Sequence, residues 1–146
     1  MPVLTRQLIA LAAALLLISV GSPARASEPT GTWLTQRGDA QIRVARCGAG
    51  MCGTVVWLRN AIDGRTGQPP VDGRNPDPNM RNRKILGLRI FAMALDGNGG
   101  WAGGIYNAED GQTYAGRLTL RDPSRLEVQG CAGPLCGSET WTRSGR

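Results

Sequence analysis

Short segments of alternating polar and apolar residues, separated by turn sequences, constrain the fold of this chain more than any other feature. In residues 113–120, Tyr114 and Leu118 fall on one face of an extended chain, and Thr113 and Arg117 fall on the other. A period of two is typical of a half-buried β-strand. Turn sequences rich in Gly, Asp and Pro recur between such segments. The pattern predicts eight strands, at residues 31–36, 40–47, 52–59, 89–95, 100–107, 112–120, 125–131 and 136–143.

The fold class that follows is all-β. No amphipathic helical pattern longer than two turns is evident. Tight turns join most of the predicted strands, which favours an antiparallel meander. Closing such a meander removes its exposed edges, so we predict a small eight-stranded antiparallel up-and-down barrel. A β-sandwich is the alternative.

Four cysteines form two matched pairs, Cys47 with Cys52 and Cys131 with Cys136. In each pair four residues separate the cysteines, glycine follows the second one, and strand-like sequence lies on both sides. A four-residue hairpin loop would place the two cysteines of a pair opposite each other, within reach of a disulfide. We therefore predict two local disulfides, which suit an oxidising compartment. A zinc site made of four thiolates is the alternative.

The first 26 residues read as a secretory signal peptide. Arg6 supplies the positive start, residues 8–20 are apolar, and the residues at 24–26 form a small-x-small cleavage site. A retained membrane anchor is the alternative, although the apolar run is short for a span of about 20 residues. We expect residues 27–146 to form a single β-barrel domain, exported to the periplasm or beyond as a monomer without stable membrane insertion.

The charge pattern argues against a nucleic-acid partner. Fourteen of the fifteen basic residues in 27–146 are arginine, and they are scattered along the chain. They form no basic runs interleaved with aromatic residues. The arginine bias fits either an anionic partner or a GC-rich genome.

Residues that could perform a reaction are scarce. The chain has no histidine, and all four cysteines are expected in disulfides, so imidazole and thiol chemistry are absent. Asp63, Asp72 and Asp77 fall in one polar connection and could act as a carboxylate pair, but they also occur in ordinary turn sequences. Residues 106–111 supply too few oxygen ligands for calcium. We expect no enzyme activity, catalytic residue, cofactor or metal, and a carboxylate-based hydrolase is the minor alternative.

Two short motifs resemble those of a known superfamily. Gly31-Thr32-Trp33 begins the first predicted strand and Trp141-Thr142-Arg143 ends the last. Lipocalins and other calycins carry a Gly-x-Trp on the first strand and an arginine, on or after the last strand, that packs across this tryptophan. The resemblance implies that Trp33 closes one end of the barrel and that Arg143 covers its ring through a cation–π contact.

A longer match covers most of residues 31–143. The stretches that carry it are GTWLTQRGDAQIRVARCGAGMCGTVVWL, NPDPNMRNRKILGL, GGWAGGIYNAEDGQTYAGRLTL and ETWTR. Together they resemble the bacterial secreted family called domain of unknown function 2147, which is regarded as calycin-like. The resemblance implies export and a small barrel, and it carries over no catalytic residue.

The function expected of such a barrel is binding. An eight-stranded barrel can hold one small ligand, and Trp57 and Tyr114 are among the aromatic side chains that could line its interior. We therefore expect a non-enzymatic protein that binds a small hydrophobic or amphipathic ligand. An envelope protein-interaction domain with a filled core is the alternative.

The long connection at residues 60–88 is expected to fold over the barrel mouth. Connections of this length are usually lids, binding loops or disordered segments. Its prolines and side-chain caps predict a short helical turn at residues 79–83. We expect Ile85 and Leu86 to face the ligand. Three basic residues would then lie at the rim, where they could attract an anionic head group: Arg81, Arg83 and Lys84.

Overall fold

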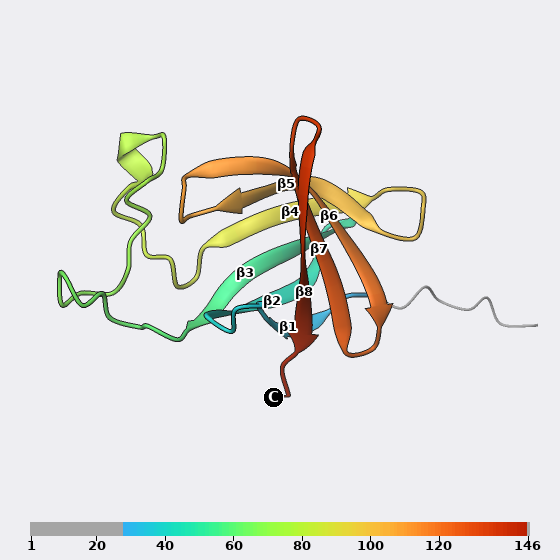
Figure 1. The fold of residues 1–146 in the computed structure, drawn as a ribbon, viewed down its shortest axis with the longest axis horizontal. Coiled ribbons are helices and arrows are strands. Elements are labelled where there is room, and N and C mark those ends of the chain that lie inside the picture. Colours follow the sequence, from blue (N-terminus) through green and yellow to red (C-terminus); the bar gives the residue numbers. More distant parts are fainter. Residues whose placement is uncertain (1–27, 146) are drawn as a thin grey trace, which may run out of the picture.

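The computed structural model describes residues 28–145, and the expected signal peptide at residues 1–26 lies outside this range. Eight antiparallel strands form a closed barrel, in which successive strands pair and β1 pairs with β8 (Figure 1). The strands are β1 (Gly31–Leu34), β2 (Ala40–Cys47), β3 (Gly50–Leu58), β4 (Arg89–Leu95), β5 (Trp101–Asn107), β6 (Gln112–Asp122), β7 (Arg125–Ala132) and β8 (Leu135–Arg143). The predicted all-β up-and-down barrel is confirmed, and the sandwich alternative is wrong.

Helix is almost absent from the described part of the chain. The one helical segment within residues 28–145 is the short 3-10 helix η1 (Pro78–Met80), whose N-cap Asp77 accepts a hydrogen bond from the amide of Asn79. The helical turn predicted at residues 79–83 is therefore shorter and begins earlier, because Asp77 and Pro78 together start it. Residues 28–145 contain no helix of the length and hydrophobicity needed to cross a membrane.

One end of the barrel is closed by Trp33 and Arg143. Trp33 is fully buried, and its indole nitrogen donates a 2.8 Å hydrogen bond to the carbonyl of Pro29. The guanidinium of Arg143 lies 4.3 Å from the centre of the Trp33 ring and donates a hydrogen bond to the carbonyl of Thr30. Gly31 has a φ of 135°, and a Cβ at this position would collide with the Arg143 guanidinium. The Gly-x-Trp spacing thus leaves room for the arginine.

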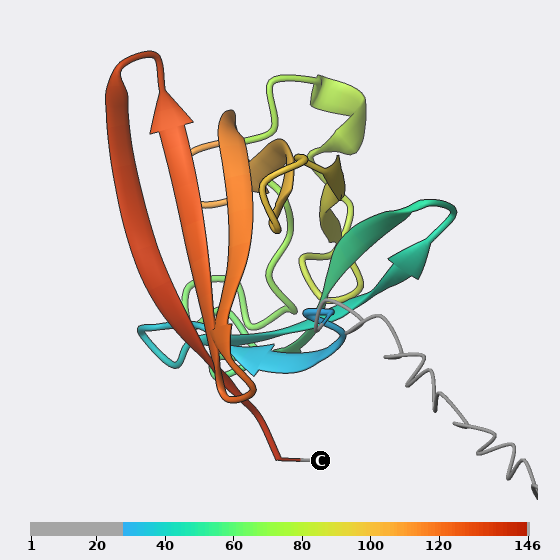
Figure 2. The ribbon, with the colours of Figure 1, turned by 90° about the vertical axis from the view of Figure 1, so that its right-hand side faces the viewer.

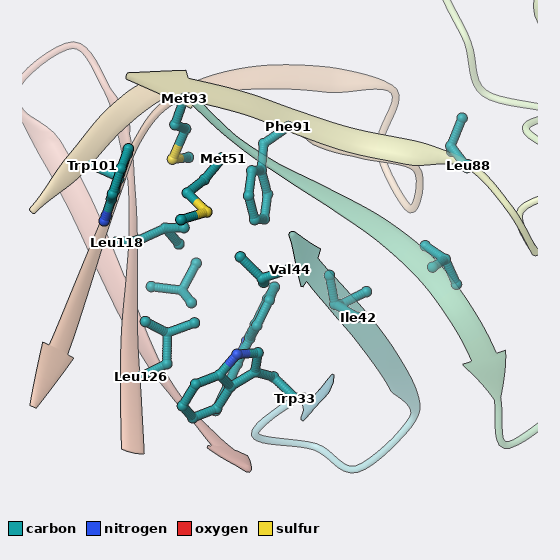
Figure 3. Close-up of a cluster of buried hydrophobic side chains, with 13 residues drawn as sticks. Trp33, Ile42, Val44, Met51, Leu88, Phe91, Met93, Trp101, Leu118 and Leu126 are labelled. Carbon is teal, nitrogen blue, oxygen red and sulfur yellow. The ribbon is translucent and has the colours of Figure 1, made fainter. Parts of the chain in front are cut away.

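The apolar core lies next to this closed end. Figure 3 shows Met51, Phe91 and Met93 of β3 and β4 pointing into the barrel toward Leu118 and Leu126. All five side chains are buried, as alternation along each strand requires. This half of the barrel is therefore filled with side chains.

Both cysteine pairs form local disulfides. Cys47 is bonded to Cys52 in the β2–β3 hairpin, and Cys131 is bonded to Cys136 in the β7–β8 hairpin, with Cα atoms 5.8 and 4.1 Å apart. This is the predicted connectivity. All four sulfur atoms are used, so the zinc alternative is wrong.

The barrel wall is incomplete between β8 and β1. β8 pairs with β7 along residues 135–142 but meets β1 only at Leu34 opposite Thr142 and Trp33 opposite Arg143. Residues 135–140 are exposed. Figure 2 shows the β7–β8 hairpin extending away from the short strand β1. The barrel is closed at the end that holds Trp33 and open at the other.

Candidate functional site

The open end of the barrel contains a cavity of about 930 Å³. In an up-and-down barrel every second connection lies at the same end. Accordingly, the cavity is bordered by Asp39 from the β1–β2 connection, Pro70 and Ile85 from the long loop, and Ala108 from the β5–β6 connection. Parts of the chain that are far apart in the sequence thus surround one space.

Apolar side chains make up the strand walls of the cavity. Val55, Ile105 and Val128 line it from β3, β5 and β7. Gly130 and Gly137 also line it and lie directly opposite each other on β7 and β8. A pair of facing glycines carries no side chains into the barrel, so space is left at the open end. Deeper in the core, side chains fill the corresponding space.

Three aromatic side chains, Tyr106, Tyr114 and Trp141, line the cavity, but Trp57 does not. Ile42 pairs with Val55 whereas Gln41 pairs with Trp57, so β3 has one extra residue at this point. Such a β-bulge reverses the faces to which later side chains point. Leu58 therefore lines the cavity, while Trp57 is 41% exposed. The expectation that Trp57 lies inside the barrel is corrected here.

Four charged side chains line the cavity, and none of them was predicted: Arg37, Asp39, Glu109 and Glu139. Arg37 pairs with Asp39 at 2.9 Å and also with Glu109, which joins the β1–β2 connection to the β5–β6 connection. The pKa of Arg37 is raised above its ordinary value, mainly by the hydrogen bond to Glu109 and next by the nearby charge of Asp39. Glu139 accepts a 2.9 Å hydrogen bond from the indole nitrogen of Trp141. For Arg37, Asp39 and Glu109, the signal available in the sequence was their position in connections at one end of the meander.

The long loop has a defined fold and forms one side of the cavity. Its two limbs pair where Val71 forms a β-bridge with Lys84, and the amide of Ile85 donates a 3.0 Å hydrogen bond to the carbonyl of Pro70. This pairing turns Pro70 and Ile85 toward the cavity. The prediction that Ile85 faces this space therefore matches its position in the structure, as does that for Tyr114.

A buried carboxylate holds the loop against the barrel. Asp72 has no exposed surface and accepts hydrogen bonds from Tyr106 at 2.6 Å and from Asn75 and Arg83 at 2.8 Å. Burial by itself would raise the pKa of Asp72, but the hydrogen bonds from these three residues outweigh it and lower the pKa below its ordinary value. The carboxylate is thus the centre of a satisfied polar network.

The other loop residues expected at the ligand lie elsewhere. Leu86 is 52% exposed, because it alternates with Ile85 and points away from the cavity. Arg83 is paired with Asp72 and lies 5.7 Å from the ring centre of Tyr106, on the side of the loop network. Arg81 donates a hydrogen bond to the carbonyl of Asn75, and Lys84 alternates with Ile85. None of these four side chains lines the cavity, so the expected cationic rim is absent from the loop.

The three aspartates considered for catalysis have separate structural roles. Asp63 accepts a 2.8 Å hydrogen bond from the amide of Arg65, Asp77 caps η1, and Asp72 holds the loop. Within residues 28–145 no group of three or more cysteine, aspartate or glutamate side chains is arranged to hold a metal ion.

A closed eight-stranded barrel, sealed at one end by a Trp–Arg contact and hollow at the other, is a lipocalin-like, calycin-type fold. Among solved structures it resembles protein HP1028 from the human pathogen Helicobacter pylori, which is described as belonging to the lipocalin family. That similarity has a TM-score of 0.67 at 22% sequence identity and covers 81% of this chain and 84% of that chain, so it shows the fold alone. No curated protein matches the sequence. The family described as "Uncharacterized protein conserved in bacteria (DUF2147)" matches residues 31–143, and the chain belongs to this family.

Proposed function

We propose that this protein is an exported, non-enzymatic binding protein that takes up one small hydrophobic or amphipathic ligand in the cavity. The observation that carries the proposal is the hollow inner face at the open end of the barrel. Its volume of about 930 Å³ is in the range of small-molecule sites, and apolar side chains line its strand walls. A ligand that fills this space would bury its apolar part at a gain of about 25 cal/mol per Å².

The distribution of apolar and charged residues around the cavity also supports an amphipathic ligand. Val55 and Val128 lie within the barrel wall, while Arg37 and Glu109 belong to the connections at the mouth. An apolar body would enter the barrel, and a polar group would stay at the rim in contact with water.

Export is part of the proposal and has two supports. The first 26 residues have the three parts of a secretory signal peptide, and two local disulfides suit an oxidising compartment such as the periplasm. The cavity favours binding over an interaction domain with a filled core, and the structural roles of Asp63, Asp72 and Asp77 give no support to a hydrolase.

Titration with the neutral apolar fluorophore N-phenyl-1-naphthylamine tests this function. We expect saturable fluorescence enhancement with wild type and a large loss of binding in Gly137→Phe, because the new ring would occupy the cavity. A Cβ at Gly137 meets no atom within 4 Å, so the barrel can accept the substitution. Gly64→Phe is the matched control, because Gly64 also has open space and lies outside the cavity. Equal binding by folded Gly137→Phe and wild type would contradict the proposal.

A further inference from the structure

Glu139 places a carboxylate on the inner face of the barrel wall. It lies two residues from Gly137 and from Trp141 on β8, so the three share one face of the strand. The strand register sets Glu139 opposite Val128, which is buried and lines the cavity. The indole nitrogen of Trp141 holds the carboxylate through a 2.9 Å hydrogen bond. Glu139 forms no ion pair with any side chain of residues 28–145. The inner wall thus presents an acid that forms no ion pair in the described chain, although it lies close enough to Arg37 for its charge to help raise the pKa of that guanidinium.

The cavity as a whole has an excess of negative charge. Among residues 28–145, three carboxylates line it, Asp39, Glu109 and Glu139, and the one guanidinium that lines it, Arg37, is already paired with the first two. Residues 28–145 taken together have the opposite balance, with fourteen basic and eleven acidic side chains. The loop cations do not change the result, because they lie outside the cavity lining. The sign of charge at the site is therefore opposite to that of the protein.

The aromatic residues of the lining also favour a cationic ligand. Tyr106, Tyr114 and Trp141 are among the residues that line the cavity. The faces of such rings attract cations, and quaternary ammonium groups are often bound by aromatic side chains near a carboxylate. Arg83 already lies over the Tyr106 ring, so Trp141 and Tyr114 are the rings left for a ligand.

We propose that the cavity selects ligands in which an apolar body carries an ammonium-type cationic group, held near Glu139 and Glu109. This inference rests on the proposed function and deepens it, because it names the charge of the ligand. The apolar body would lie among Val55, Ile105 and Val128. An anionic head group would be repelled by the excess carboxylates.

The expected size of the effect follows from the exposure of these groups. Glu109 has a side chain that is 62% exposed, and Glu139 is also exposed. Exposed charge pairs contribute up to about 1 kcal/mol, so each carboxylate should change affinity by about two- to fivefold. Salt should weaken this contribution.

A displacement titration with three probes of equal chain length tests the inference. Bound N-phenyl-1-naphthylamine is displaced by decyltrimethylammonium, 1-decanol or decanoate, each below its micellar concentration, at low salt and at about 0.5 M salt. We expect decyltrimethylammonium to bind about tenfold more tightly than decanoate at low salt, since two carboxylates contribute, with 1-decanol between them. Glu139→Gln should weaken binding of the cation about two- to fivefold and leave 1-decanol unchanged. Glutamine retains the acceptor for Trp141.

The control is Glu28→Gln, because Glu28 pairs with Arg46 and lies outside the cavity. An equal loss of cation affinity in Glu28→Gln would mean that overall charge acts, which overturns the inference. Decanoate binding as tightly as the cation, while 1-decanol still binds, would also overturn it and leave the proposed function intact. If neither the fluorophore nor any of the three probes binds, the proposed function itself fails.

Discussion

The hydroxyl of Tyr106, on β5, donates a 2.6 Å hydrogen bond to the carboxylate of Asp72 in the long loop. Asp72 is fully buried, and Tyr106 is also among the residues that line the cavity. One residue is therefore shared between the ligand site and the network that fixes the loop. The same loop carries Pro70 and Ile85, which line the cavity.

Replacing Tyr106 with phenylalanine should destabilise the protein through the buried carboxylate. Tyr106→Phe leaves Asp72 with one donor fewer, and we expect the free energy of unfolding in urea to fall by about 1 to 3 kcal/mol. Tyr114→Phe is the matched control, because Tyr114 donates a similar hydrogen bond to the exposed Asp110. Its cost should be below about 1 kcal/mol. Equal losses in the two variants would show that burial of Asp72 contributes nothing.

The same carboxylate should make stability depend on pH in the acid range. The pKa of Asp72 is lowered in the folded protein despite its burial, through hydrogen bonds from Tyr106, Asn75 and Arg83. Such a group stabilises the native state fully above its unfolded pKa of about 3.9, and this stabilisation is lost as pH falls through the lower folded pKa. Asp72→Asn should therefore be less stable than wild type at neutral pH.

Urea unfolding of both proteins between about pH 7 and pH 3 measures this dependence. The difference in stability should narrow as the pH falls below about 4. Other aspartates with lowered pKa values, such as Asp63 and Asp122, titrate in both proteins and cancel in the difference. A difference that stays constant over this range would be inconsistent with an ionised Asp72 in the network.

At the closed end, Trp33 and Arg143 should contribute unequally. Trp33→Ala removes a fully buried ring and should lower the free energy of unfolding by about 3 to 5 kcal/mol. Arg143→Ala removes the contact with that ring and the hydrogen bond to Thr30, and we expect a loss of about 1 to 2 kcal/mol. Arg143→Lys keeps the charge but loses the planar fork, so its loss should be intermediate. No measurable effect of Arg143→Ala would show that the stack does not stabilise the barrel.

Each disulfide should be local and individually dispensable for folding. Trypsin without reductant should release residues 47–59 and 126–143 as separate peptides, each with an internal disulfide, because both cysteines of a pair fall on one peptide. Two peptides joined to each other would refute the pairing. For these short loops, removing both cysteines of one pair should cost about 2 kcal/mol. A folded protein of lower melting temperature is the expected result.

Much of the barrel could be predicted from local sequence. Each predicted strand lies within two residues of its observed bounds, because alternation and turn residues are properties of neighbouring positions. The disulfides were predictable for the same reason, since each pair spans one hairpin. Trp33 and Arg143 could be paired only through their resemblance to calycin motifs.

The site was less predictable, because it depends on strand register and on contacts between residues far apart in the sequence. Trp57 was expected inside, but the bulge in β3 turns it outward, and no local pattern announces that extra residue. Arg83 was expected at the rim and is instead drawn to Asp72, its partner in a buried network. Glu139 was missed because its sequence neighbours are polar, and only its register opposite Val128 shows that it faces inward.

The sequence by itself determined the strands, their order around the barrel and the cysteine pairs, because these follow from residue alternation and short-range turns. Only the tertiary structure decided that the barrel is filled at one end and hollow at the other. That difference arises where β1 ends at Leu34 and leaves residues 135–140 of β8 unpaired on the side of β1, and where Gly130 faces Gly137. It also decided the charge of the cavity, since Arg37, Glu109 and Glu139 meet only when three separate parts of the chain are brought to one end. The empty volume and the net charge of the cavity depend on side chains that are distant in the sequence and close in space, so the local sequence pattern does not reveal them.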